Sequence, residues 1–417
     1  MPWKETDAMD QREEFVKRAR VKTGTMRALC EEFGITPKTG YKWLNRVEDL
    51  GAEGLAERSR RPHSANQQLD EWTTCEIVRL KGEHPHWGPT KLLTLFKNQH
   101  PTAKPPSLSS VKRVLGRCGL VQRRQRRPAA PGGRISTRFE PTAPNQLWTV
   151  DFKGWWYTTT RRKVVPLTVC DAFSRFILDI RVVPDGKTAT IQACFETLFE
   201  HYGLPLAIRS DNGSPFASWS APLGLSQLSV WWLALGINLD RIRPGHPEEN
   251  GRHERMHRNL ALEVEGQIDG DLHAQQAALD VWRDEFNLLR PHAALDQRTP
   301  AELYRSSERR YDPQRLAPEY PLGYWRRKVS SNGCIKLGNS HLLLTTALRG
   351  WEVGLQPLDS ARFKVWFGEL CLGELNVRDE TFRVASRPDP GVMLSPHQHY
   401  HPIGLLPMSQ LESVTDV

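Results

Sequence analysis

The stretch that most constrains this chain runs from Arg243 to Leu260, where a turn rich in proline and glycine opens onto a helix. Met256, Leu260 and Val264 recur at positions i, i+4 and i+8, which predicts one apolar stripe along that helix. At about 100° per residue, Glu254 falls on nearly the opposite side. A carboxylate held there suits a metal ligand, and it equally suits a solvated glutamate. The residues upstream bear on that choice.

Length and cysteine content limit the class of protein. With 417 residues the chain is too long for one compact domain, so we expect three or four units. The seven cysteines are scattered without a CxxC pair, so neither a zinc ribbon nor a disulfide framework is indicated. No apolar run has the length of a membrane span, and the first residues lack the apolar core of a signal peptide. These features predict a cytoplasmic protein without a membrane partner.

The charge balance favours an anionic partner. Lys and Arg number 57 against 48 Asp and Glu, a net charge of +9, which fits nucleic acid binding. Residues 121–141 combine arginines with proline and glycine, which predicts an extended basic linker. We expect this linker to follow DNA phosphates, although it is also compatible with a merely solvated tether. Its candidate DNA contacts are Arg123, Arg124, Arg126 and Arg127.

Residues 1–60 predict a helix-turn-helix domain. Met26, Leu29, Cys30 and Phe33 have helical spacing, Gly34-Ile35 makes the turn, and Thr36 precedes Pro37 as an N-cap for the next helix. In such motifs the second helix enters the major groove of DNA. Its candidate base and phosphate contacts are Lys38, Thr39, Lys42 and Arg46. A helical hairpin inside a bundle is the alternative.

Residues 65–120 predict a second helical domain of the same kind. Glu71–Lys81 and Thr90–Lys97 are expected to be helical, and Ser109 is expected to cap a third helix, Ser110–Cys118. That helix carries Lys112 and Arg113 as candidate DNA contacts.

Residues 142–305 have a pattern that predicts an α/β region. The expected strands are Leu147–Phe152, Val164–Asp171, Phe176–Val182, Ala207–Ser210 and Ile237–Ile242, with a polar turn over Thr158–Lys163. The expected helices are Thr188–Tyr202, Ser226–Leu235, the helix after Asn250, and Leu272–Leu288. Three successive strands followed by alternating helices and strands predict a mixed sheet with helices packed on it.

Residues 320–385 predict a small β-barrel or sandwich, because short strands alternate with glycine-containing turns. The expected strands are Gly333–Leu337, His341–Thr345, Trp351–Gln356, Phe363–Phe367 and Glu369–Leu375. Residues 386–417 are expected to form a flexible tail.

Three acids stand near the ends of elements that a mixed sheet could bring together. Asp151 lies on the first strand, on the face opposite Val150, and Asp211 ends the fourth strand before Asn212-Gly213. Glu254 lies on the helix after the fifth strand. Each has an ordinary interpretation as an ion-paired, turn or surface residue. Their order and their places at element ends are more specific, because functional acids gather where strands give way to loops.

The sequence around these acids resembles the DDE transposase and retroviral integrase superfamily. The similar motifs are Leu147–Asp151, Ser210–Phe216 and Pro247–Arg255, with further similarity at Asp171–Arg175, Arg290–His292 and Thr299–Glu302. Helix-turn-helix domains before this core and a small β domain after it are similar to the order in bacterial insertion-sequence transposases.

The resemblance implies a multidomain fold. Its parts are a ribonuclease-H-like α/β core, N-terminal all-α helix-turn-helix domains and a C-terminal small β-barrel. It assigns catalysis and metal binding to Asp151, Asp211 and Glu254, with two Mg²⁺ ions per site and Mn²⁺ as a substitute. Hard cations of this kind take oxygen ligands. Two such ions can activate an attacking oxygen and stabilise a leaving one. Without ions the three carboxylates would repel one another, so we expect a loosely ordered site.

The implied function is that of a bacterial, nucleoid-associated transposase. It would bind the terminal inverted repeats of a mobile element, cleave the 3′ ends and transfer them into target DNA. Since two ends must be held together, a homodimer or larger assembly on double-stranded DNA is expected. Arg252, Arg255 and Arg258 are placed to hold phosphates, or are simply solvated. His246, His253 and His257 are interpreted as DNA-facing or structural rather than as ligands.

Two other functions fit the same pattern. One is a DNA-binding regulator derived from a transposase with an inactive core. The other is a nuclease that hydrolyses strands without joining them. The presence of all three acids argues against the first.

Overall fold

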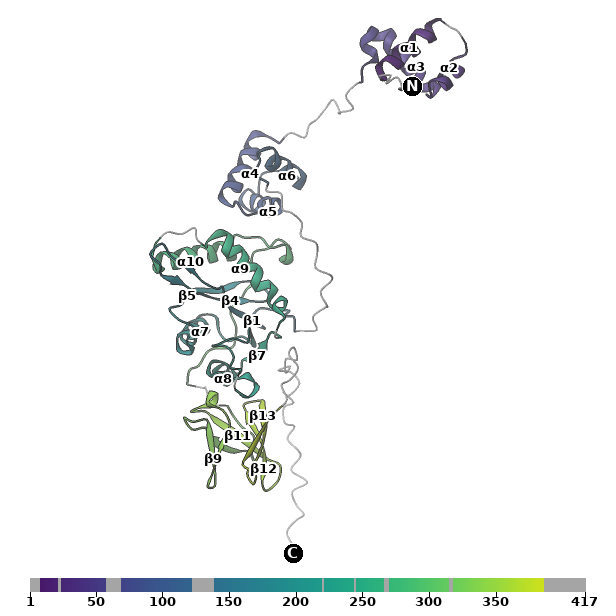
Figure 1. Ribbon diagram of the computed structural model, residues 1–417. Coiled ribbons are helices and arrows are strands. Elements are labelled where there is room, and N and C mark those ends of the chain that lie inside the picture. The colour runs from purple at the N-terminus through teal and green to yellow at the C-terminus, as the bar shows by residue number, and fades with distance from the viewer. Residues whose placement is uncertain are drawn as a thin grey trace, which may run out of the picture. The chain divides into compact units, whose positions relative to one another are not determined.

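The computed structural model describes residues 8–21, 24–57, 69–121, 139–219, 221–243, 245–265, 270–314 and 318–385 (Figure 1). The chain divides into two compact units, Met1–Asp70 and Glu71–Val417. The arginines predicted to contact DNA at positions 123, 124, 126 and 127, and the predicted tail 386–417, lie outside the described residues. Within the described part, no helix combines the length and the apolarity that a membrane crossing requires.

The first unit contains the predicted pair of helices and the turn between them. Its elements are α1 (Ala8–Val21), α2 (Met26–Glu32), α3 (Pro37–Leu50) and a 3-10 helix, Gly51–Leu55. The hydroxyl of Thr36 accepts a hydrogen bond from the backbone N–H of Thr39 at 3.3 Å, which confirms Thr36 as the N-cap. Gly40 allows close packing, because a Cβ there would lie 2.7 Å from Sγ of Cys30 and 2.9 Å from Cζ of Phe15.

The second unit begins with three helices, α4 (Glu71–Glu83), α5 (Pro89–Gln99) and α6 (Leu108–Arg117). The expected cap of α6 was wrong. Oγ of Ser107, rather than of Ser109, accepts the capping hydrogen bond, from the N–H of Ser110 at 3.1 Å. The helix therefore starts at Leu108, two residues earlier than expected, since its first turn is closed by the earlier serine.

A five-stranded mixed sheet forms the centre of the second unit, with strand order β5-β4-β1-β6-β7. Its strands are β1 (Trp148–Phe152), β4 (Pro166–Asp171), β5 (Ile177–Val182), β6 (Ala207–Ser210) and β7 (Asn238–Arg241). β4 pairs antiparallel with both β1 and β5, while β1, β6 and β7 run parallel. The expected polar turn is flanked by a short ladder that sequence reasoning missed, β2 (Trp156–Tyr157) paired with β3 (Lys163–Val164).

Helices cover both faces of this sheet (Figure 1). On one face α7 (Thr188–Tyr202) and α8 (Gln227–Ala234) pack on Trp148 and Val150 of β1. On the other face α9 (Gly251–Glu263) and α10 (Leu272–Leu288) pack on Ile177 and Ile180 of β5. A short helix α11 (Pro300–Leu303) and the 3-10 helices Pro222–Gly224, Pro247–Asn250 and Ala293–Leu295 complete this region.

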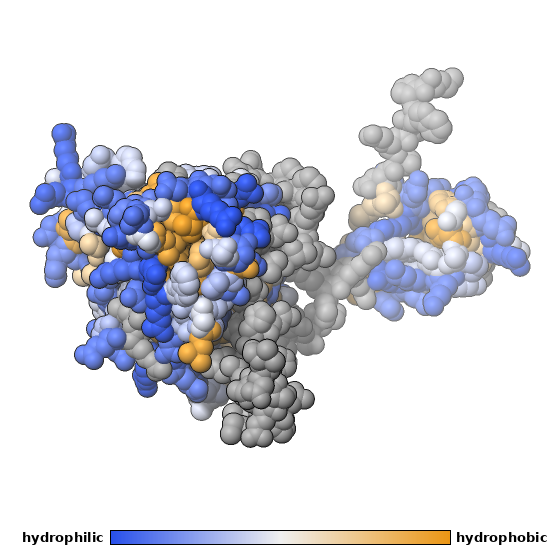
Figure 2. Space-filling view, turned by 90° about the horizontal axis from the view of Figure 1, so that it is seen from below, coloured by the Kyte–Doolittle hydropathy of each residue, from blue (hydrophilic) through white to orange (hydrophobic). Residues whose placement is uncertain are grey.

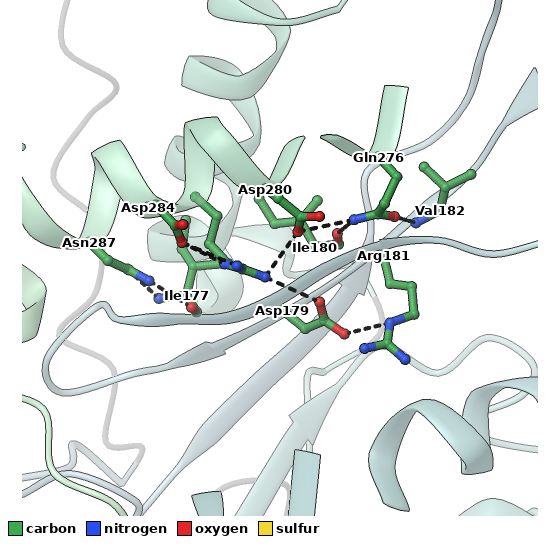
Figure 3. Close-up of polar contacts among 10 residues, drawn as sticks. Ile177, Asp179, Ile180, Arg181, Val182, Gln276, Asp280, Asp284 and Asn287 are labelled. Atoms are coloured by element: carbon green, nitrogen blue, oxygen red, sulfur yellow. Dashed lines mark hydrogen bonds and ion pairs between the residues drawn. The ribbon is translucent and has the colours of Figure 1, made fainter. Parts of the chain in front are cut away.

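The edge strand β5 is covered by side chains of α10 (Figure 3). The amide of Gln276 accepts from the N–H of Val182 at 2.8 Å and donates to the carbonyl of Ile180 at 2.8 Å. The amide of Asn287 makes the same two kinds of bond with the N–H and carbonyl of Ile177, both at 2.9 Å. Backbone groups that an edge strand leaves open are thereby satisfied.

The C-terminal strands form an open sheet. Five strands pair antiparallel in the order β14-β13-β12-β11-β8, and β9 pairs with β10. Their bounds are β8 (Trp325–Lys328), β9 (Cys334–Leu337), β10 (Ser340–Leu343), β11 (Glu352–Pro357), β12 (Arg362–Phe367), β13 (Leu370–Asn376) and β14 (Thr381–Val384), with a 3-10 helix at Thr346–Leu348.

The expected closed barrel is not seen, because β8 and β14 end the sheet without pairing with each other. The β9–β10 hairpin instead shares a core with this sheet, in which Ile335 and Leu342 pack with Val353 and Val365. The described surface in Figure 2 is mainly hydrophilic, interrupted by hydrophobic areas.

Candidate active site

Two of the three predicted acids lie on neighbouring parallel strands. In the ladder between β1 and β6, Trp148 pairs with Ile208 and Thr149 with Arg209. Continuing this register by two residues brings Asp151 opposite Asp211, at the carboxyl ends of the two strands. Neighbouring strands lie about 4.8 Å apart, so the sheet itself makes these acids neighbours.

The third acid, Glu254, is carried by the first turn of α9. The predicted apolar stripe is confirmed, since Met256, Leu260 and Val264 are buried while Glu254 is exposed. A buried ion pair ties the preceding turn to the sheet. Nη2 of Arg209 on β6 lies 2.7 Å from Oδ2 of Asp240 on β7, and Nη1 donates to the carbonyl of Glu249 at 3.3 Å.

Asp151 has the least favourable surroundings for a negative charge among the three acids. Burial, together with the charges of Asp211 and Glu254, raises its pKa to about 7, and a backbone hydrogen bond at Phe152 offsets only part of this rise. In the described part of the chain, no Lys or Arg side chain forms an ion pair with any of the three. The site therefore concentrates negative charge that a cation would relieve.

The donor set fits hard divalent cations, because it consists of carboxylate oxygens. Among the described residues, however, no three His, Cys, Asp or Glu side chains stand close enough to hold one metal ion together. The acids thus interact through their charges without forming a closed set of ligands.

Two histidines of α9 lie behind Asp151. The buried ring of His253 bridges two hydroxyls, with Nδ1 2.8 Å from Oγ1 of Thr149 and Nε2 2.6 Å from Oγ1 of Thr168. Nε2 of His257 lies 2.7 Å from the same Thr168 hydroxyl, and its Nδ1 lies 3.9 Å from Oδ2 of Asp151. The Thr168 hydroxyl also lies 2.9 Å from the carbonyl oxygen of Asp151.

Burial lowers the pKa of His257 to about 3 and that of His253 well below its usual value, so both rings are neutral. Of the two interpretations of these histidines, the structural one therefore holds for His253 and His257. Their threonine partners were missed, and the only signal in the sequence was the small polar residue at each of two otherwise apolar strand positions.

A different acid, Asp171, serves the fold. It is fully buried and accepts hydrogen bonds from the backbone N–H of Asn145 and of Ser174, both at 2.7 Å, and from Oγ of Ser174 at 2.6 Å. Oδ1 of Asn145 in turn accepts from Nε1 of Trp148 at 3.0 Å and from the hydroxyl of Tyr304 at 2.9 Å. This network joins residues from the two ends of the α/β region.

Family models match the same region. Residues 141–247 and 235–300 match models described as "Integrase core domain". Together these two matches span residues 141–300, the integrase core domain region of this chain. Ahead of it, residues 11–63 match a "Helix-turn-helix domain" and residues 39–115 a "Homeodomain-like domain". The predicted resemblance to transposases and integrases with an N-terminal helix-turn-helix is confirmed.

The similar proteins are of the expected kind. An uncharacterized 31.7 kDa protein of insertion element IS407 from Burkholderia multivorans is 28% identical over 58% of this chain and 83% of its own length. An uncharacterized 39.2 kDa protein of insertion element IS476 from Xanthomonas euvesicatoria is 26% identical over 58% of this chain and 66% of its own length. The catalytic core of BIV integrase is 23% identical over 38% of this chain and 93% of that chain, with a TM-score of 0.30, too low to establish a shared fold.

Basic side chains gather on the integrase core domain beside Glu254. Arg252, Arg255 and Arg258 are exposed, and Nη2 of Arg252 lies 2.5 Å from Oε2 of Glu140. Sequence reasoning missed Arg175. Burial lowers the pKa of Arg175, and the charges of Arg252 and Arg255 lower it further, which places the three guanidinium groups in one cluster. The Ser174-Arg175 motif was the available signal.

The helical domains ahead of the integrase core present most of their predicted contacts to solvent. On α3, Lys38 and Lys42 are exposed and Arg46 is partly buried. Both Nζ of Lys42 and the guanidinium of Arg46 lie near the ring of Trp43, at 4.8 and 5.1 Å. Oγ1 of Thr39 lies 3.0 Å from Oγ1 of Thr36, so this side chain takes part in the cap. On α6, Lys112 and Arg113 are exposed while Val111, Val114 and Leu115 are buried.

Proposed function

We propose that this chain is a DNA transposase. Its helix-turn-helix domains would bind the terminal inverted repeats of a mobile element, through Lys38, Thr39, Lys42 and Arg46 on α3. Lys112 and Arg113 on α6 would provide a second set of contacts. Its integrase core would cleave the 3′ ends and transfer them into target DNA.

One observation carries the proposal. Asp151 and Asp211 end neighbouring parallel strands, Glu254 lies on the exposed face of α9, and the charges of the last two raise the pKa of the first. A protein that needed these acids only for its fold would pair them, as it pairs Asp240 with Arg209. Unpaired, converging carboxylates are the arrangement that phosphoryl-transfer sites use to hold divalent cations.

The roles of the side chains follow from their positions. Asp151, Asp211 and Glu254 would hold the metal ions. When bound, two Mg²⁺ or Mn²⁺ ions would supply activation of the attacking oxygen and stabilisation of the leaving oxygen. The neutral His253 ring and Thr168 keep β1 and α9 in place behind Asp151. Arg175, Arg252 and Arg255 would hold DNA phosphates beside the acids, with Arg258 one turn beyond Glu254.

The expected partners are double-stranded DNA and further copies of the chain. Transfer of an element needs two ends in one complex, so we expect a homodimer or larger assembly once DNA is bound.

The test is to incubate the purified protein with candidate end DNA, a plasmid target and Mg²⁺, and to sequence the junctions. The proposal is supported if the wild-type protein gives joined products and the Asp151→Asn variant gives none while it still binds the end DNA. Free 3′-hydroxyl ends without joined products would instead identify a nuclease. End binding by a wild-type protein that neither cuts nor joins would identify a regulator.

A further inference from the structure

A short hairpin directly after Asp151 presents aromatic rings to solvent. It is formed by β2 and β3, with Trp156 paired to Val164 and Tyr157 to Lys163. Side chains alternate across β2, because successive residues of a strand point to opposite faces. Trp156 is 8% exposed, whereas Trp155 and Tyr157 on either side of it are 56% and 58% exposed.

The buried side of the hairpin is anchored in the protein. Trp156 packs with Met256 of α9 and Leu279 of α10, and its Nε1 donates to Oε1 of Gln275 at 3.0 Å. The tip is closed by Thr158, whose N–H donates to the carbonyl of Arg162 at 2.9 Å and whose Oγ1 accepts from the N–H of Arg162 at 3.0 Å. The exposed rings are therefore held on an ordered element.

The exposed side combines these rings with positive charge. The rings of Trp155 and Tyr157 meet edge to face at 5.2 Å, and Nζ of Lys163 lies 5.0 Å from the Trp155 ring. Arg161 and Arg162 are exposed at the tip, and the sequence between Asp151 and Asp171 contains no Asp or Glu. The surface is complementary to an anionic polymer that carries aromatic groups.

We propose that Trp155 and Tyr157 stack on unpaired bases of the DNA strand whose phosphates contact Arg161, Arg162 and Lys163. A closed duplex offers no base face for such stacking, whereas a frayed end does, and base stacking on aromatic side chains tolerates any sequence. Trp155 follows Asp151 by four residues, which limits their Cα separation to about 14 Å. The hairpin would thus hold an opened DNA end near the three acids. This inference rests on the proposed function, because it assumes that the core acts on DNA ends.

The test compares two oligonucleotides of equal length in buffer with EDTA, a blunt duplex and one whose end carries a few unpaired nucleotides. We expect the wild-type protein to bind the forked duplex more tightly. The Trp155→Ala/Tyr157→Ala double variant should lose about tenfold in affinity for the forked duplex only. The matched Trp155→Phe/Tyr157→Phe variant keeps both ring faces and should remain within a few-fold of the wild type. A fluorescent base analogue at the unpaired position should be quenched by the wild-type and phenylalanine proteins and not by the alanine protein.

Three results would overturn the inference. They are equal affinity of the wild-type protein for both duplexes, an equal loss on both by the alanine variant, and a change of oligomeric state without a change in fork affinity. Unchanged thermal unfolding of the alanine variant controls for folding. Because these measurements contain no divalent metal, a failure of strand transfer leaves them unaffected, and the two proposals fail separately.

Discussion

Two acids near opposite ends of β1, Asp171 on the paired strand β4 and Asp151 on β1 itself, have different surroundings. Near the start of β1, Trp148 pairs with Asp171, which accepts three hydrogen bonds and is fully buried. Near its other end stands Asp151, whose neighbours Asp211 and Glu254 are also acids. Burial raises the pKa of both Asp151 and Asp171, but several donors offset this effect at Asp171, whereas at Asp151 one backbone N–H opposes burial and two neighbouring acids. The acid surrounded by donors belongs to the scaffold, and the acid surrounded by other acids belongs to the candidate site.

The largest effect is expected where a scaffold acid loses a cation. Arg209→Met leaves Asp240 buried without its guanidinium partner, which costs about 3–5 kcal/mol of the free energy of unfolding. Urea denaturation of the metal-free protein measures this. The double variant Arg209→Met/Asp240→Leu should recover most of the loss. A loss below about 1 kcal/mol would show that the pair is not structural.

Removing the charge of Asp171 should also destabilise the protein, by about 2 kcal/mol. In Asp171→Asn the amide NH₂ faces a donor, so a buried N–H of Asn145 or Ser174 loses its acceptor. The same denaturation experiment measures the change. Stability equal to that of the wild type would show that the hydrogen bonds of Asp171 do not support the fold, and would contradict the contrast with Asp151.

Asp151→Asn should instead stabilise the protein, by raising its free energy of unfolding at high pH. Since the pKa of Asp151 is raised to about 7, the folded protein holds a proton that the unfolded chain releases near pH 4. In EDTA the stability contributed by this proton is present below pH 4 and falls as the pH rises through 7. We expect the variant to be more stable than the wild type at pH 8, by on the order of 1 kcal/mol, and equal to it at pH 4. Chemical unfolding at the two pH values measures the difference, and a less stable variant at pH 8 would contradict it.

The smallest effect concerns the cations beside the acids. Arg252→Gln and Arg255→Gln should each weaken DNA binding across sequences and reduce the slope of log affinity against log salt by about 1. Fluorescence anisotropy over a salt series measures both quantities. Arg378→Gln, in the turn between β13 and β14, removes the same charge elsewhere. If all three variants behave alike, the cluster has no special role.

Local patterns were sufficient where an element has its own boundary signals. The bounds of α7, β6 and α10 agree with those expected, because apolar spacing defines each element and residues such as Gly203 and Asp271 mark its ends. β8 and β14 were missed because most of their residues are exposed and show no apolar alternation. The prediction of a closed barrel was wrong, because closure depends on pairing between distant strands, which no local pattern specifies.

The candidate site, too, could be predicted only in part from local patterns. The places of the acids at element ends were enough to expect that a mixed sheet could bring them together. The parallel pairing of β1 with β6, which makes Asp151 and Asp211 neighbours, came only from the structure. Their catalytic role stays a prediction. The contact between His253 and Thr168 could not be predicted, because the two residues are far apart in sequence and neither has a distinctive local pattern. Asp171 likewise could not be distinguished from a catalytic acid until its donors were known.

The amides of Gln276 and Asn287 on β5 have a consequence for assembly. A second copy cannot extend the core sheet across this margin, because the groups that would receive its strand are already engaged. Intermolecular sheet growth, a route to aggregation, is closed there. A complex that brings two DNA ends together would therefore join through helices, loops or the opposite margin of the sheet, formed by β7.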